Sequence, residues 1–217
     1  MRLQLSEFCM SIQDIGQGIP TLLIHGYPLN NQMWQPQLEG LADSARLIAP
    51  DLRGHGDSEA TDGAYTMEAH AQDCNELLEK LAIHQKVILC GLSMGGYIAL
   101  AFYRLYFQKV AGMVLVSTRA AADSPEAQAN WDNATRLVQE QGIQAIAEGM
   151  VPRLLSQESL SKQPLLASRI VDLMRHISLQ GVQGDLHGMK IRRNSLRMRP
   201  RRNREVVPIP TQCELEA

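Results

Sequence analysis

The clearest candidate for chemistry is a serine flanked by glycines, in the segment Gly91-Leu92-Ser93-Met94-Gly95. This G-x-S-x-G spacing lies between an apolar run and an apolar helical pattern, which is the strand, tight turn and helix context of a nucleophile elbow. Such a turn strains the backbone of its serine, and small neighbours such as Gly91 and Gly95 make that possible. We therefore expect Ser93 to be a catalytic nucleophile, with the backbone N–H of Met94 facing a developing oxyanion.

A second segment, His25-Gly26-Tyr27-Pro28, follows the apolar run at 21–24. Ligand sites in open α/β sheets form at the carboxyl ends of strands, so this loop and the serine turn are expected on one edge. The N–H of Tyr27 is the expected second oxyanion donor, because Pro28 has no N–H and Gly26 permits a tight turn. His25 is interpreted as a brace of this supporting loop, because a catalytic base belongs beside the Ser93 hydroxyl.

The third segment, Asp51–Ser58, also follows a predicted strand and is interpreted as scaffold. Arg53 is expected to tie this loop by pairing with Asp51 or Asp57. His55 and Asp57 would give a metal only two ligands, so no metal site is predicted. The glycines of the chain complete no G-x-G-x-x-G pattern, which argues against a dinucleotide fold, and no cofactor is expected.

The elements that must position these segments alternate as in an α/β fold with a mostly parallel sheet and flanking helices. Apolar strands are expected at 21–24, 46–49, 86–90 and 110–116, an antiparallel edge hairpin at 2–15, and an amphipathic helix at 67–81. Thr66 is expected to cap that helix. Helical patterns at 126–141, 143–150 and 165–176 predict an inserted lid. The chain is thus divided into a core (1–118), a helical lid (119–189) and a tail (190–217).

Together and in this order, the three segments resemble the α/β-hydrolase superfamily, in particular its esterase, lactonase and non-metal haloperoxidase-like branch. The resemblance covers roughly residues 1–189. It implies hydrolysis of a small ester or lactone through an acyl-enzyme at Ser93, with oxyanion donors at Tyr27 and Met94. Perhydrolysis by the same serine is an alternative that the sequence does not separate.

The resemblance also implies an acid and a histidine after two further strands, and this chain shows no pattern for either. After Ser93 the remaining histidines are His176, interpreted as a surface partner of Asp172, and His187, and both are open candidates for the base. Asp123 is an alternative acid without an evident partner. Loss of a triad member lowers turnover by about 10⁴ to 10⁶, so impaired catalysis and an exposed apolar edge at 110–116 are expected.

The C-terminal residues 190–217 differ in charge from the rest of the chain. Its 217 residues, 45% of them hydrophobic and with a net charge of -2, suit a globular domain. Residues 1–189 carry a balance of -7, whereas residues 190–217 carry +5, with all eight cations of this tail between Lys190 and Arg204. The hypothesis is that the tail is poorly ordered and derives from a shifted reading frame or an altered gene end.

The basic tail also suggests a function of another class, a non-catalytic hydrolase-like protein whose tail binds an anionic partner. The tail lacks interleaved aromatic residues, which argues against nucleic acid as that partner. No apolar run approaches the roughly 18 residues of a membrane span, and the start lacks a signal-peptide core, so a cytoplasmic protein without membrane contact is expected. The four scattered cysteines predict buried thiols. The sequence indicates neither the oligomeric state nor the acyl preference.

Overall fold

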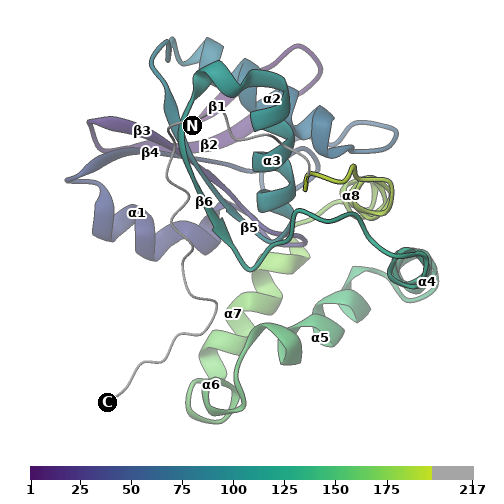
Figure 1. Cartoon of the computed structure of the whole chain (residues 1–217). Coiled ribbons are helices and arrows are strands. Elements are labelled where there is room, and N and C mark those ends of the chain that lie inside the picture. The colour runs from purple at the N-terminus through teal and green to yellow at the C-terminus, as the bar shows by residue number, and fades with distance from the viewer. Residues whose placement is uncertain (197–217) are drawn as a thin grey trace.

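The computed structural model describes residues 1–196, and its centre is a six-stranded sheet (Figure 1). The strands are β1 (Arg2–Gln4), β2 (Cys9–Ile15), β3 (Ile19–Ile24), β4 (Ala45–Pro50), β5 (Val87–Leu92) and β6 (Val110–Val116), in the order β1-β2-β4-β3-β5-β6. Strands β4, β3, β5 and β6 are parallel, and β1 and β2 are antiparallel to their neighbours. The carboxyl ends of β3, β4 and β5 therefore meet at one edge, and so do the loops that follow them.

Helices flank this sheet and then form a group after β6. Those between the strands are α1 (Gln35–Leu41), α2 (Met67–Lys80) and α3 (Met94–Tyr106). Those after β6 are α4 (Pro125–Gln141), α5 (Ile143–Leu154), α6 (Gln157–Lys162), α7 (Pro164–Arg175) and α8 (Leu179–Lys190). In Figure 1, α4 to α7 lie beyond the edge of the sheet, whereas α8 returns toward α3.

Both faces of the sheet are covered, as a parallel sheet requires. Leu22 and Ile24 of β3 belong to the large core cluster that α2 and α3 share. Leu23 points to the other face and packs with Trp34 and Leu38 beside α1. This period-two alternation explains why Figure 1 shows α1 on one side of the sheet and α2 and α3 on the other.

Most of the predicted elements are confirmed. Strand β6 has the predicted bounds, β1 and β2 form the antiparallel hairpin, and the Thr66 hydroxyl caps α2 by accepting a hydrogen bond from the Ala69 N–H at 3.0 Å. Helices α1, α6 and α8 were not predicted. Helix α8 was not predicted because it contains three glycines, and glycine is a weak helix former.

The expected ion pairing of Arg53 is wrong. Its guanidinium forms a bidentate pair with Asp73 of α2, with N···O distances of 2.7 and 2.6 Å, and a further contact of 3.0 Å with Glu7. Asp51 instead accepts hydrogen bonds from the backbone N–H groups of Asn31 at 2.8 Å and Asp57 at 3.1 Å. The loop is thus tied to helix α2 by charge and to its neighbours by backbone hydrogen bonds.

The end of the helical group differs from the proposed boundary at 189/190. Helix α8 includes Lys190, and Arg192 is buried against the body of the protein, where it pairs with Asp123 at 2.9 Å. Within the described part of the basic tail, Arg192 and Ser195 are buried against the body of the protein, and the rest of the tail, 197–217, lies outside the described residues. Within residues 1–196 the sheet ends at β6, whose residues 112–116 are half-buried.

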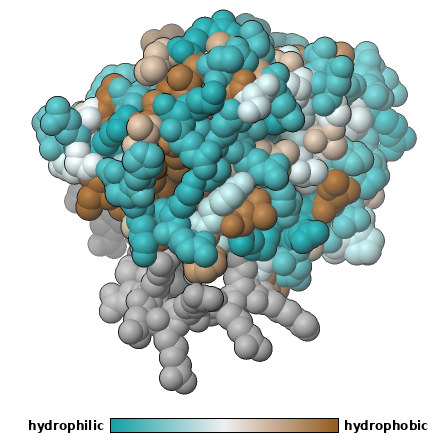
Figure 2. Space-filling model, turned by 90° about the horizontal axis from the view of Figure 1, so that it is seen from above, coloured by the Kyte–Doolittle hydropathy of each residue, from teal (hydrophilic) through white to brown (hydrophobic). Residues whose placement is uncertain are grey.

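The outer face seen from above is largely hydrophilic, with apolar side chains gathered in small separate groups (Figure 2). Scattered apolar residues of this kind are normal on protein surfaces. Within residues 1–196 no helix combines the length and the apolar character needed to cross a bilayer.

Candidate active site

Ser93 occupies the tight turn between β5 and α3. Its backbone has φ 51° and ψ -111°, a positive-φ conformation that non-glycine residues rarely adopt. The Ser93 N–H donates to the Val116 carbonyl at 2.9 Å, and its carbonyl accepts from the Thr118 hydroxyl at 2.8 Å. These bonds to the end of β6 and the loop after it hold the turn, while the Ser93 hydroxyl itself makes no hydrogen bond to any described residue.

Two glycines let the turn fit against its surroundings. A Cβ at Gly91 would lie 2.3 Å from the Gly95 carbonyl oxygen, and a Cβ at Gly95 would lie 2.2 Å from the Ile24 carbonyl oxygen. Both distances are far inside van der Waals contact. The spacing G-x-S-x-G is therefore required here by backbone packing around Ser93.

The segment after β3 lies beside this turn. The position of a Cβ built on Gly26 is 3.6 Å from the Ser93 Cβ, and Tyr27 and Ser93 line the same cavity. Met94 is the first residue of α3, so its N–H has no acceptor within the helix. The structure thus brings together Tyr27, Ser93 and Met94, the three residues that the sequence predicted to act on one carbonyl group.

His25 lies beneath this loop, fully buried. Its Nε2 accepts a hydrogen bond from the Leu52 N–H at 3.0 Å, and its Nδ1 lies 3.1 Å from the Gly26 carbonyl oxygen. Burial and the neighbouring His55 ring hold the pKa of His25 well below its ordinary value, which favours the neutral ring that can accept at Nε2. His25 thereby links the loop after β3 to the loop after β4.

The Tyr27 hydroxyl is buried and has no hydrogen-bond partner in residues 1–196, and burial raises its pKa. A buried unpaired hydroxyl costs about 1–3 kcal/mol. We therefore expect Tyr27→Phe to raise the free energy of unfolding by about 1 kcal/mol, as measured by urea denaturation. Because the proposed oxyanion donor is the backbone N–H, reaction at Ser93 should be unchanged in this variant, and a loss of that reaction would show that the hydroxyl takes part.

The cavity that Ser93 and Tyr27 line has a volume of about 560 Å³ and is walled mainly by the helical group. Its side chains are mostly apolar and come largely from α4, α5 and α8. The lining includes Trp131, Leu137, Ile146, Met150 and Leu186. A cavity of this size and character suits a small, largely apolar substrate.

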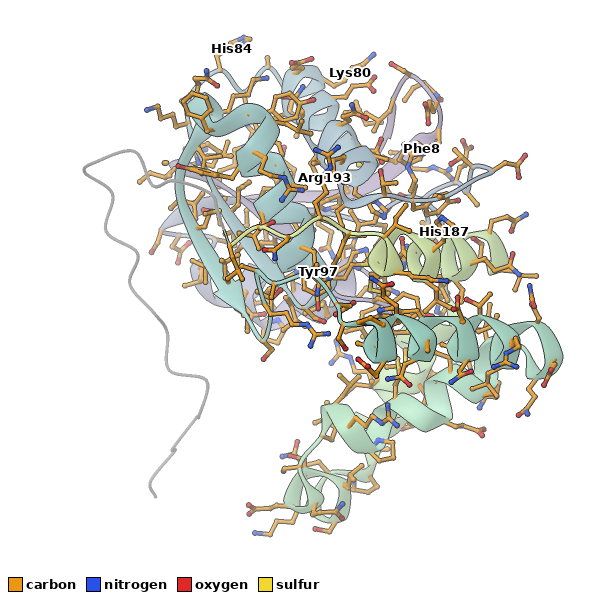
Figure 3. The ribbon with its side chains drawn as sticks, turned by 45° about the vertical axis from the view of Figure 1, so that its right-hand side comes forward. Phe8, Lys80, His84, Tyr97, His187 and Arg193 are labelled. Atoms are coloured by element: carbon orange, nitrogen blue, oxygen red, sulfur yellow. The ribbon has the colours of Figure 1, made fainter. Side chains whose placement is uncertain are left out.

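All six histidines of the chain lie within residues 1–196, and none of them lines this cavity. His176 directly follows α7, and its Nδ1 lies 2.7 Å from the Asp172 backbone oxygen, whereas the Asp172 carboxylate pairs with Arg175 at 3.0 Å. The expected side-chain pair of His176 with Asp172 is therefore wrong. His187 lies exposed on α8, which runs beside α4 (Figure 3). Neither candidate base contacts the Ser93 hydroxyl.

Asp123, for which the sequence showed no partner, is the centre of a polar cluster. Its buried carboxylate accepts from the Arg119 guanidinium, from Arg192 at 2.9 Å and from the Trp131 indole N–H at 2.8 Å. The Arg192 guanidinium also stacks over the Tyr97 ring, 4.0 Å from its centroid. Asp123 thus joins the loop after β6, helix α4 and the chain after α8.

Sequence reasoning missed Asp185 of α8. This fully buried carboxylate lies 2.8 Å from His70 Nε2 and 3.1 Å from His55 Nε2. His55 Nδ1 lies 3.0 Å from the Arg53 carbonyl oxygen. The cluster connects α8, α2 and the loop after β4 within the core. No group of three His, Cys, Asp or Glu side chains in residues 1–196 has the arrangement of a metal site.

Three comparisons with known proteins bear on this site. The sequence model of the α/β hydrolase fold matches residues 20–189. The chain is 32% identical over 177 residues to 3-oxoadipate enol-lactonase 2 of Acinetobacter baylyi, covering 81% of this chain and 63% of that protein. It is 45% identical over 85 residues to a non-heme chloroperoxidase of Kitasatospora aureofaciens, covering 39% of this chain and 30% of that protein. The chain therefore spans less than two thirds of the length of these curated relatives.

Solved structures agree with the sequence comparison. A thermophilic esterase from Thermogutta terrifontis superposes with a TM-score of 0.86 at 39% identity, over 90% of this chain and 74% of that one. The enol-lactonase of Burkholderia xenovorans gives 0.82 at 25% identity, over 88% and 74%. With its parallel sheet, its turn at Ser93 and the match over residues 20–189, this chain belongs to the α/β-hydrolase fold family.

Proposed function

We propose that this chain is a serine hydrolase that opens a small ester or lactone through an acyl-enzyme at Ser93. The observation that carries the proposal is the Ser93 turn. Its strained backbone presents to the cavity a hydroxyl that has no hydrogen-bond partner among residues 1–196, and Tyr27 lines the same cavity. The esterase and lactonase names of the relatives support the same chemistry. The proposed oxyanion donors are the backbone N–H groups of Tyr27 and Met94.

In the proposed reaction, the Ser93 oxygen bonds to the substrate's carbonyl carbon while the carbonyl oxygen gains negative charge near the two N–H groups. The bond to the alcohol oxygen then breaks, and the alcohol takes up a proton. Water hydrolyses the acyl-enzyme and restores the serine. Because no histidine lines the cavity, the Ser93 proton passes to water or to the leaving group. We therefore propose that acylation by this chain is slow, supported by the oxyanion donors and by substrate binding.

A fluorophosphonate probe tests the proposal, because it phosphonylates a serine only where the hydroxyl is accessible and oxyanion donors are in place. We expect labelling at Ser93, identified by peptide mass spectrometry, and its complete loss in Ser93→Ala. His176→Ala and His187→Ala are matched controls that should label within about twofold of the wild type, because neither side chain lines the cavity. A strong decrease in either control would identify the missing base.

Absence of labelling in a sample with the circular dichroism of a folded α/β protein would contradict the proposal. It would then favour the alternative, a non-catalytic member of the family that binds an anionic partner. That alternative relies on the basic tail, of which Arg192 is already paired with Asp123 and the residues from 197 onward are not described.

A further inference from the structure

The charged side chains on the wall of the Ser93 cavity are all cationic. Arg119, in the loop after β6, and Arg153, near the end of α5, both line it, and no aspartate or glutamate of the described residues does. The rest of the lining is uncharged and mainly apolar. Because both cations lie on the cavity wall, their charge favours the entry of anionic ligands.

The two arginines differ in whether a protein carboxylate pairs with them. Arg119 shares the Asp123 carboxylate with Arg192, so these three side chains together keep one positive charge. Arg153 is exposed at the cavity, and its guanidinium makes no ion pair or hydrogen bond with any residue between 1 and 196. Among the described residues, Arg153 is therefore the cavity cation that is free to pair with a ligand.

A guanidinium presents a planar fork of N–H donors that matches a carboxylate, and in Arg153 no described side chain occupies this fork. On the same wall, Met150 and Ile146 lie about one and two helical turns before the end of α5 and offer apolar contacts for a short carbon chain. The cavity thus combines the reactive hydroxyl, an apolar stretch and an unpaired cation.

From this combination we propose that the substrate carries a carboxylate in addition to its reacting carbonyl group, and that Arg153 binds that carboxylate. The proposal rests on the proposed function for the identity of the reacting group, and it adds the substrate class. The carboxylate sets the orientation of the bound substrate, because only the end of the molecule that carries it can form an ion pair with Arg153. Neutral esters of the same length lack this contact.

The test measures binding with ligands that cannot be hydrolysed. Glutaramate, a carboxylate with an amide in place of the ester, and glutaramide, its neutral isostere, are titrated into the whole chain by calorimetry, together with the four- and six-carbon homologues. At low salt we expect the acid of the best length to bind about fivefold to tenfold more tightly than its diamide. Added salt should reduce that preference.

Arg153→Gln should abolish most of the preference and leave the affinity for the diamide unchanged. The matched control is Arg169→Gln on α7, which removes one exposed charge from the same helical group without lining the cavity, and it should keep the preference. Because Arg153 is exposed, the melting temperatures of both variants should stay close to that of the wild type.

Equal affinities for acid and diamide, a preference that survives Arg153→Gln, or no binding of any acid at about 10 mM would each overturn the proposal. The test does not depend on Ser93, so the two proposals fail separately. A charge preference without fluorophosphonate labelling would support an anion-binding cavity and contradict the proposed hydrolase activity. Labelling without a charge preference would support the proposed hydrolase activity and contradict the proposal that the substrate carries a carboxylate.

Discussion

Gly95→Ala is expected to lose about 3 kcal/mol or more of unfolding free energy and to reduce labelling of Ser93 by about 100-fold. The added methyl group would lie 2.2 Å from the Ile24 carbonyl oxygen and 2.8 Å from the His25 carbonyl oxygen. Both atoms are main chain, so no side-chain rotation relieves the overlap. The loop that carries Tyr27 must move away from Ser93, which separates the proposed oxyanion donors. Urea denaturation and the labelling rate measure the two effects.

Gly40→Ala is the matched control. Gly40 also lies in a helix, α1, and nothing is within 4 Å of its Cβ position, so alanine should stabilise the protein by about 0.5–1 kcal/mol. The same substitution is thus expected to have opposite signs at the two sites. If Gly95→Ala were as well tolerated as Gly40→Ala, that result would contradict the close packing of α3 against the end of β3 and the loop after it.

The elements around Ser93 could be predicted because their signals are local. A run of apolar residues before the glycine-flanked serine, and the same arrangement before His25-Gly26-Tyr27-Pro28, indicate two strands whose ends share an edge. The turn conformation of Ser93 follows from the same short segment. Neither conclusion needs information from a distant part of the chain, and the structure places the loop after β3 beside the Ser93 turn, with Tyr27 and Ser93 on one cavity.

The contacts that sequence reasoning missed join residues far apart in the chain. Arg53 had two nearby carboxylates in its own loop, yet it pairs with Asp73, because α2 brings that carboxylate over the loop and backbone N–H groups already satisfy Asp51. The partners of Asp123 include Arg192, 69 positions away. Spacing along the chain carries no signal for such pairs.

Helix α8 was missed for a related reason. A Cβ at Gly184 would lie 2.7 Å from the Tyr65 ring, and one at Gly188 would lie 1.9 Å from the Tyr65 carbonyl oxygen. These glycines let α8 approach the core closely, at the expense of helix propensity, so the sequence reads as a poor helix. That close approach buries Asp185 beside His55 and His70.

Asp185→Asn should therefore be among the most damaging single substitutions, with a loss of about 3 kcal/mol. The carboxylate is fully buried between the Nε2 atoms of His55 and His70, at 3.1 and 2.8 Å. The neutral amide removes the negative charge that lies between these two rings. Asp172→Asn, on the exposed end of α7, is the control and should change stability by less than about 0.5 kcal/mol. Thermal and urea unfolding at neutral pH compare the two variants.

The contribution of Asp185 to stability should also appear in the wild type, as a loss of unfolding free energy at acidic pH. His55 and His70 hold the pKa of Asp185 at about 2, against its ordinary 3.8, despite a burial that opposes ionisation. Because the folded-state pKa is the lower one, the unfolded chain binds the proton first as pH falls. The stabilisation, about 2 kcal/mol, is therefore complete above pH 4 and lost between about pH 4 and pH 2. Over this range the wild type should lose more stability than Asp185→Asn, so that their unfolding free energies converge. Parallel acid dependences for the two proteins would show that Asp185 is not ionised in the fold.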